Sequence, residues 1–198
     1  MTAEPTLRPE RPFFSSGPTA KFPGWSLDKI NTASLGRSHR AAYPKSRLKY
    51  AIDLTHELLG LPEDYLVGIM PGSDTGALEC AMWTMLGSRP ATVAAWESFG
   101  NVWIQDAAKQ LKLPNLQVLD ADYGQIPDLT QVPQDNDVVF TWNGTTSGAK
   151  IANTDWLAPG RTGITINDAT SAVFAMEMDW AKLDATTFSW QKVMGSEA

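Results

Sequence analysis

Cysteine is nearly absent from this sequence, and it has neither an excess of positive charge nor long apolar runs. The single cysteine, Cys80, excludes a framework of internal disulfides, and its apolar neighbours predict a packed helical residue rather than a nucleophile. The net charge of −6 argues against a general nucleic-acid binder, because clustered Lys and Arg deliver most of that affinity. No run of about eighteen apolar residues occurs, and residues 1–12 lack the apolar core of a signal peptide. We therefore expect a cytoplasmic protein without a membrane partner.

A nucleotide-binding P-loop is also absent. The turn at residues 71–77, Pro-Gly-Ser-Asp-Thr-Gly-Ala, is rich in glycine, but Ala77 and Leu78 stand where a P-loop needs Lys and Ser or Thr. Taken alone, such a turn is most often a tight connection between a strand and a helix. Its glycines would also let the backbone approach an anion, and the free N–H groups of the following helix favour a phosphate. The turn is therefore a candidate phosphate cradle.

Hydrophobic residues make up 43% of the 198 residues and charged residues 19%, which is enough for a sizeable core. Apolar segments typical of strands alternate with segments typical of helices, as in βαβ units. This pattern predicts an α/β fold with a mostly parallel sheet flanked by helices. The expected strands are 66–70, 92–96, 116–119, 137–141, 163–167 and 186–189, and the expected helices are 46–59, 77–86 and 101–111.

Two polar residues follow predicted strands late in the chain. Asp168 comes directly after strand 163–167, and Lys192 comes shortly after strand 186–189. Ligands of parallel sheets bind at the carboxyl ends of the strands, so both side chains are expected at one edge. An acid and an amine there suit pyridoxal phosphate, because the acid can keep the ring nitrogen protonated and the amine can form an imine with the aldehyde. Either residue alone could equally be a turn residue or a solvated charge.

The two segments that carry these residues are more specific than either residue. Residues 167–172, Asn-Asp-Ala-Thr-Ser-Ala, and 188–192, Phe-Ser-Trp-Gln-Lys, resemble in wording and order the phosphoserine aminotransferase family. Its members are class V, fold-type I enzymes that depend on pyridoxal phosphate. The resemblance runs from residues 14–18 to Lys192 and covers about the first half of a family-length protein. It implies an extended N-terminal arm at residues 1–12, where three prolines occur, and a truncated cofactor-binding large domain at residues 13–198.

The resemblance implies a set of cofactor-binding residues besides the catalytic Lys192 and Asp168. Backbone amides of Asp74 and Thr75 would support the cofactor phosphate, although better-known members carry an arginine at about the Thr75 position. Gln191 would contact the same phosphate. The other implied contacts are with the ring: Trp103 would stack on it and Thr145 would donate a hydrogen bond to its 3-oxygen. The alternative for Trp103 is simple packing, since eight tryptophans are present, and the alternative for Thr145 is an ordinary Ser/Thr turn.

A basic stretch near the start of the chain suits a phosphate monoester. Arg37, His39 and Arg40 lie within four positions of an otherwise acidic chain, although a solvated basic loop is the alternative. By resemblance, His39 and Arg40 would bind the substrate phosphate, commonly from the partner subunit, and Arg37 is a weaker candidate. Ser16 would lie near the substrate carboxylate, unless its Ser-Gly-Pro is only a turn. His56 has no motif around it and is expected to be structural.

The reaction implied by the resemblance is transamination between L-glutamate and 3-phosphohydroxypyruvate. It gives O-phospho-L-serine and 2-oxoglutarate and serves serine and pyridoxine biosynthesis. The full-length protein is expected to be a homodimer, and no metal site is expected. One alternative is another class V enzyme, such as an alanine–glyoxylate aminotransferase or a cysteine desulfurase, which shares the acid and the lysine but not the Ser-His-Arg stretch. The other alternative is a truncated fragment that catalyses nothing.

Overall fold

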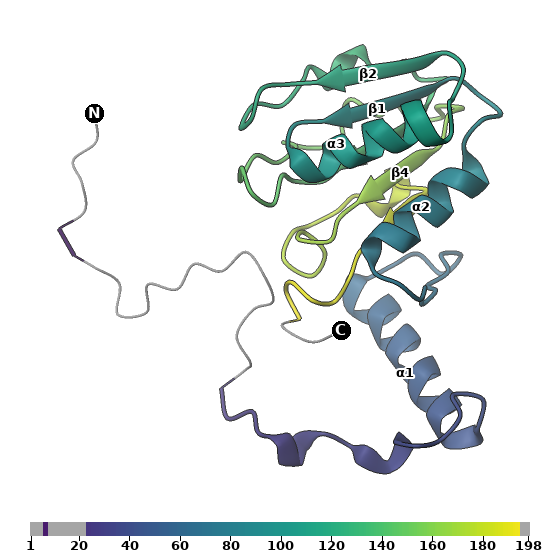
Figure 1. Cartoon of the computed structure of the whole chain (residues 1–198), viewed down its shortest axis with the longest axis vertical. Helices are drawn as coiled ribbons and strands as arrows, with labels where there is room; N and C mark the ends of the chain where they lie inside the picture. The colour runs from purple at the N-terminus through teal and green to yellow at the C-terminus, as the bar shows by residue number, and fades with distance from the viewer. Residues whose placement is uncertain (1–5, 8–22, 195–198) are drawn as a thin grey trace.

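The computed structural model describes residues 6–7 and 23–194 of the chain (Figure 1). Its centre is a sheet of five strands in the order β2-β1-β3-β4-β5, and every neighbouring pair is parallel. The prediction of an α/β fold with a mostly parallel sheet is confirmed. The strands are β1 (Ala91–Ala95), β2 (Leu116–Asp120), β3 (Asp137–Thr141), β4 (Thr165–Asp168) and β5 (Ala185–Thr187).

The three predicted helices are present, and each begins a few residues earlier than expected. Glu97 explains one of these starts, because its side chain accepts a hydrogen bond from the backbone N–H of Gly100 at 2.9 Å and so caps α3. Gly60 ends α1 in a left-handed conformation, with φ at 59°. None of the helices in the described ranges is long and apolar enough to cross a membrane. The helices are α1 (Ala42–Leu59), α2 (Asp74–Met85) and α3 (Ser98–Gln105), which continues into a π-helical turn η3 (Asp106–Gln110).

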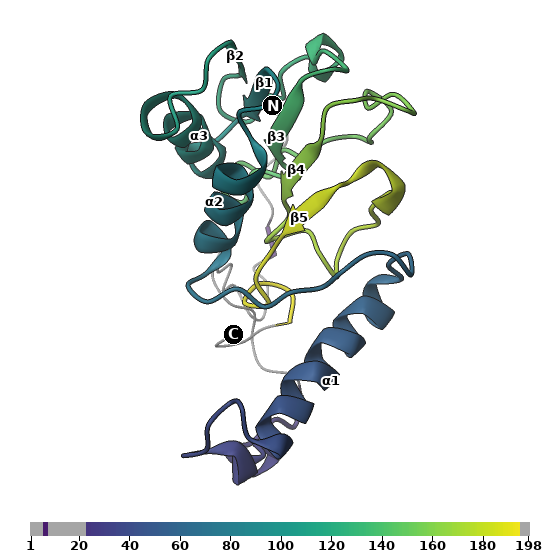
Figure 2. The ribbon, with the colours of Figure 1, turned by 90° about the vertical axis from the view of Figure 1, so that its right-hand side faces the viewer.

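Four short 3-10 turns complete the described secondary structure: η1 (Leu27–Lys29), η2 (Thr32–Ser34), η4 (Leu129–Gln131) and η5 (Trp180–Lys182). Helix α1 projects from the sheet, and η1 and η2 lie beyond its far end, as both ribbon views show (Figures 1 and 2). This segment extends away from the sheet, and the C-terminal end of α1 joins the rest of the described chain at Leu59, whose carbonyl oxygen accepts a hydrogen bond from Nε1 of Trp180 at 2.9 Å.

Helices α2 and α3 lie on the same face of the sheet (Figure 2). Leu78 and Met82 of α2 and Trp103 of α3 form a buried cluster there with Val93 of β1 and Ile166 of β4. Successive side chains of a strand point to opposite faces, so the residues that flank these in each strand face the other side. One face is thus covered by helices, as the alternating segments predicted.

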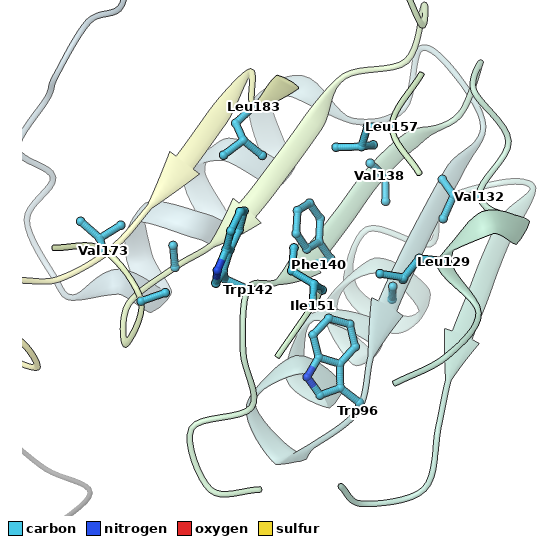
Figure 3. Close-up of a cluster of buried hydrophobic side chains, with 13 residues drawn as sticks. Trp96, Leu129, Val132, Val138, Phe140, Trp142, Ile151, Leu157, Val173 and Leu183 are labelled. Carbon is cyan, nitrogen blue, oxygen red and sulfur yellow. The ribbon is translucent and has the colours of Figure 1, made fainter. Parts of the chain in front are cut away.

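The opposite face is covered by connecting segments and short 3-10 turns rather than by α-helices. Phe140 of β3 is at its centre and is fully buried, and its ring meets that of Trp156 edge-on, with the centroids 5.2 Å apart. Figure 3 shows the side chains of Trp96, Trp142 and Ile151 gathered in the same cluster. Because these residues come from loops as well as strands, packing of this face fixes the loops that follow β3 and β4.

The prediction of a strand at residues 66–70 is wrong. No residue of this segment pairs with another strand within the described ranges, and Leu66 is 96% exposed. A groove of about 500 Å³, lined by Val67, Ile69 and Thr187 among others, separates the segment from β5. An apolar run becomes a strand only when a neighbouring backbone supplies its hydrogen-bond partners, and no strand among residues 23–194 supplies them to this one.

Truncating the central aromatic ring of the loop-covered face is a test of this packing. We expect Phe140→Ala to lower the free energy of unfolding by about 3–5 kcal/mol, because the ring is fully buried and leaves a cavity. Urea unfolding followed by tryptophan fluorescence measures the change. Tyr123→Ala, at a residue that is 63% exposed, is the matched control and should shift stability by no more than about 0.5 kcal/mol. Equal effects of the two substitutions would contradict the assignment of this core.

Candidate functional site

The carboxyl ends of β3, β4 and β5 lie level with one another. The register pairs Thr141 with Asp168 across β3 and β4, and Asp168 with Thr187 across β4 and β5. Parallel strands all run the same way, so the residues that follow these positions leave the sheet on one edge. A cavity of about 150 Å³ opens at this edge, and both Asp168 and Lys192 line it. The acid and the amine are thus brought together, as their places after the two strands predicted.

The same cavity also collects the other predicted cofactor-binding residues. They arrive from four directions: the start of α2, the body of α3, the loop after β3 and the loop after β5. No local sequence pattern joins these segments, so only the order of the strands brings them together. The predicted residues that line the cavity are Asp74, Thr75, Trp103, Thr145, Asp168, Gln191 and Lys192.

Donors on two sides hold the carboxylate of Asp168. The backbone N–H and the hydroxyl of Thr170 donate to Oδ1 at 3.1 and 2.9 Å, and the indole Nε1–H of Trp103 donates to Oδ2 at 3.3 Å. A carboxylate with these donors has a fixed orientation toward the cavity. The hydrogen bond from Trp103 was missed by the sequence analysis, which assigned this ring only to stacking. The signal available was that a buried indole N–H needs an acceptor.

Hydroxyl and amide groups from the loops after β3 and β4 meet on another wall. The hydroxyls of Thr145 and Ser171 lie 2.6 Å apart, and Nδ2 of Asn143 donates to the Ser171 hydroxyl at 3.4 Å. Ser171 and Asn143 line the cavity but were not singled out from the sequence. Ser171 lies inside the segment 167–172 that the sequence analysis quoted, and Asn143 lies two residues before the predicted Thr145, which is the signal that could have found them.

The turn before α2 brings a helix N-terminus to the cavity. Ser73 has a backbone φ of 125°, which residues other than glycine rarely adopt, and Gly72 before it has a φ of 116°. The first N–H groups of α2, from Asp74 onward, have no carbonyl partner within the helix. These N–H groups and the helix dipole favour an anion at this end of the cavity.

A second carboxyl group, that of Asp74, faces the cavity beside Asp168. Burial first, and then the negative charge of Asp168, raise the pKa of Asp74 to about 7, although the hydroxyls of Thr170 and Thr187 partly offset the rise. Lys192 is the third titratable group on the lining. The cavity therefore combines two acids and one amine with the positive end of a helix.

This set of groups fits the three reactive parts of pyridoxal phosphate. Asp168, held by its donors, suits a protonated ring nitrogen, and the amine of Lys192 suits an aldehyde. The N-terminus of α2 suits a phosphate. The roles of the individual residues stay predictions, but nothing on the described lining conflicts with the group.

The residues predicted to bind a substrate phosphate do not line this cavity. Arg37, His39 and Arg40 lie in the turn that precedes α1, and all three are exposed. Ser16 and most of the predicted arm at 1–12 lie outside the described residues. His56, expected to be structural, makes a 3.1 Å hydrogen bond between its ring Nε2 and the carbonyl oxygen of Pro62.

Comparison with known proteins gives relatives along nearly the whole chain. No protein-family model matches it. The chain is 56% identical over 194 residues to a phosphoserine aminotransferase of Methanosarcina mazei, and 54% identical over 194 residues to one of Methanosarcina barkeri. Each match covers 98% of this chain and 52% of the relative. The chain thus spans about half the length of the curated relatives it matches.

Solved structures of aminotransferases share the fold. A phosphoserine aminotransferase from Cytophaga hutchinsonii superposes with a TM-score of 0.72 at 26% identity, over 81% of this chain and 45% of that one. An alanine–glyoxylate aminotransferase from Nostoc superposes with a TM-score of 0.61 at 15% identity, over 77% of this chain and 44% of that one. At that identity the second likeness shows the fold alone.

The hydrogen bond from Trp103 to Asp168 can be tested against a second buried tryptophan. Trp103→Phe and Trp96→Phe shrink buried rings alike, but Nε1 of Trp96 has no hydrogen-bond partner within the described residues. We expect Trp103→Phe to destabilise the chain by about 1 kcal/mol more than Trp96→Phe, because only the first leaves a carboxylate oxygen without its donor. Urea unfolding of both variants measures the difference. A larger loss from Trp96→Phe would show that the bond to Asp168 contributes nothing.

Proposed function

We propose that the cavity of this chain binds pyridoxal phosphate and serves transamination. The chain belongs to the phosphoserine aminotransferase family and spans about half the length of the relatives that it matches. The proposed reaction runs between L-glutamate and 3-phosphohydroxypyruvate and gives O-phospho-L-serine. The observation that carries the proposal is that Asp168 and Lys192 line one cavity closed by the start of α2. When bound, pyridoxal phosphate supplies an aldehyde that exchanges amines and a ring that accepts electrons.

Lys192 and Asp168 are the proposed catalytic residues. The Nζ of Lys192 would hold the aldehyde of the cofactor, and as a free amine it would take the proton from the substrate Cα. The carboxylate of Asp168 would keep a proton on the ring nitrogen. Thr170 and Trp103 serve this step by holding the Asp168 oxygens in place through the hydrogen bonds described above.

Other lining residues position the cofactor in this proposal. The backbone N–H groups of Asp74 and Thr75, at the start of α2, would bind the phosphate together with the side chain of Gln191. Trp103 would pack against the ring and exclude water from it. The hydroxyl of Thr145, already paired with that of Ser171, would donate to the 3-oxygen of the ring.

The residues proposed for the substrate phosphate require a second subunit. His39 and Arg40 are exposed on the projecting segment before α1, away from the lining of their own cavity. We propose that the full-length protein is a homodimer in which this segment reaches the cavity of the other subunit. Ser16 keeps its proposed place near the substrate carboxylate.

The alternatives differ in which observation would favour them. An alanine–glyoxylate aminotransferase shares the fold at 15% identity, whereas the relatives at 56% and 54% identity are phosphoserine aminotransferases. That contrast supports an acceptor with a phosphate group. A non-catalytic fragment is the second alternative, because the chain spans about half the length of those relatives.

Labelling tests the proposed role of Lys192. Incubation with pyridoxal phosphate followed by borohydride should attach the reduced cofactor at Lys192, and peptide mass spectrometry locates it. We expect Lys192→Ala to abolish this label, because no other lysine lines the cavity within the described residues. Lys109→Ala, at an exposed lysine of η3, is the control and should label normally. A label retained by Lys192→Ala would show that another amine reacts.

An acceptor screen tests the substrate. With glutamate as donor, 3-phosphohydroxypyruvate should be turned over far better than hydroxypyruvate, which lacks only the phosphate. We expect Arg40→Ala to reduce that preference roughly 10-fold or more, because a charge-assisted hydrogen bond contributes about 1.5–3 kcal/mol. Arg47→Ala, whose guanidinium lies 4.8 Å from the ring of Tyr50 on α1, is the control.

Two results of this screen would contradict the proposal. Equal use of both acceptors would favour a phosphate-independent aminotransferase of the same fold. Absence of turnover by a chain that nevertheless takes up the cofactor would favour the non-catalytic fragment.

A further inference from the structure

The cavity contains two carboxyl groups whose surroundings differ sharply. Both oxygens of Asp168 accept hydrogen bonds, from Thr170 and from Trp103. Asp74 is the first residue of α2, and its Oδ1 is buried without a hydrogen-bond partner among the described residues. Three donated hydrogen bonds therefore reach the carboxylate of Asp168, whereas Oδ1 of Asp74 receives none from the described residues.

An ionised Asp74 would be costly in this position. A buried carboxylate oxygen without a donor loses its hydration and gains nothing in return. A second carboxylate, that of Asp168, lines the same cavity and adds repulsion, and two carboxyl groups that share a site commonly share one proton. The N-terminus of α2 opposes this by favouring negative charge, but its effect is smaller than burial beside another anion.

The charged groups that face Asp74 come from two other elements. Asp168 lies at the end of β4, and Lys192 lies in the loop after β5; no other titratable group lines the cavity within the described residues. The neutral hydroxyls of Thr170 and Thr187 also approach Asp74. A carboxylate is a stronger acceptor than a hydroxyl, so the carboxylate of Asp168 is the preferred acceptor for a proton placed on Asp74.

We propose that Asp74 is a positioning residue that keeps a proton and shares it with Asp168 while the cavity holds no ring, and that it releases this proton when a cationic ring nitrogen binds Asp168. The second half rests on the proposed function. In the ligand-free chain Asp74 donates the hydrogen bond that the ring nitrogen would later donate. On binding, Asp168 accepts the ring N–H instead, and the proton of Asp74 leaves to solvent.

A cation beside Asp168 cancels the negative charge that Asp74 senses, and this lowers the pKa of Asp74. The phosphate that the proposed function places at the start of α2 acts in the opposite direction, so a net release requires the effect of the cation to be the larger. Asp168 keeps its electron pairs throughout and exchanges one donor for another. No bond other than the O–H bond of Asp74 breaks in this exchange.

The ligand-free chain provides the first test. In a carboxyl carbon NMR titration of chain labelled at aspartate, with the Asp74 signal assigned by its loss in Asp74→Asn, we expect Asp74 to titrate at about pH 7. In Asp168→Asn the midpoint should move to lower pH, because the neighbouring charge is gone. The pair is ruled out if Asp74 titrates at about pH 4, with ordinary aspartates, or if Asp168→Asn leaves its midpoint in place.

Stability against pH gives an independent readout of the same pair. The pKa of Asp74 is raised on folding. Its contribution to the free energy of unfolding is therefore fully present below the unfolded pKa near 3.8 and is lost as pH rises to about 7. The melting temperature of the wild-type chain should therefore fall more between pH 5 and pH 8 than that of Asp74→Asn. Asp122→Asn, at an exposed carboxyl, should keep the wild-type fall. Identical profiles for the wild type and Asp74→Asn would count against the pair.

Calorimetry of pyridoxal phosphate binding tests the release. Titrations at pH 6 in two buffers of different ionisation enthalpy count the protons exchanged on binding. The wild-type chain should release up to about one proton more than Asp74→Asn, since other proton changes are common to both. Equal counts would overturn the release. If the wild type fails to bind the cofactor, the proposed function and the release both fall, while the ligand-free titration still decides whether the carboxyl pair exists.

Discussion

The parallel alignment of β3, β4 and β5 is the constraint on which the rest of this molecule depends. Backbone hydrogen bonds from Trp142 N–H to the carbonyl of Asp168, at 2.8 Å, and from Ala169 N–H to the carbonyl of Thr187, at 2.9 Å, close the ends of these strands together. A slip of one residue between β3 and β4 would turn Asp168 toward the opposite face. The buried side chains on both faces oppose such a slip, so the packing of the core determines the geometry of the cavity.

Charged and buried polar groups gather at the sheet edge where these strands end. The cavity holds two acids side by side, an amine, and a helix N-terminus reached through a strained Ser73. The two acids repel each other, and a cation beside Asp168 would relieve that repulsion. An anion at the start of α2 would accept hydrogen bonds from its free N–H groups, and packing elsewhere in the sheet can offset the cost of such a site.

The predicted cofactor-binding residues and the predicted phosphate-binding residues lie in two separate parts of the described chain. The sheet with α2 and α3 brings together every predicted cofactor ligand, whereas the basic turn near His39 lies on the projecting segment before α1. A groove of about 500 Å³ also lies between residues 67–70 and β5. The residues predicted to bind a cofactor and those predicted to bind a substrate phosphate thus lie in different parts of the described chain.

The sequence alone determined the class of fold, five of the six expected strands and the three helices, because apolar periodicity and turn residues act locally. It also indicated Asp168 and Lys192, because their positions after predicted strands and the residues around them can be read from the sequence alone. The strand at 66–70 failed because its apolar pattern says nothing about whether a neighbouring backbone is present. The bond from Trp103 to Asp168, the contact of Thr145 with Ser171 and the pairing of Asp74 with Asp168 join residues far apart in the chain. Only the tertiary structure decided these, because strand order and packing set which distant side chains share a buried site.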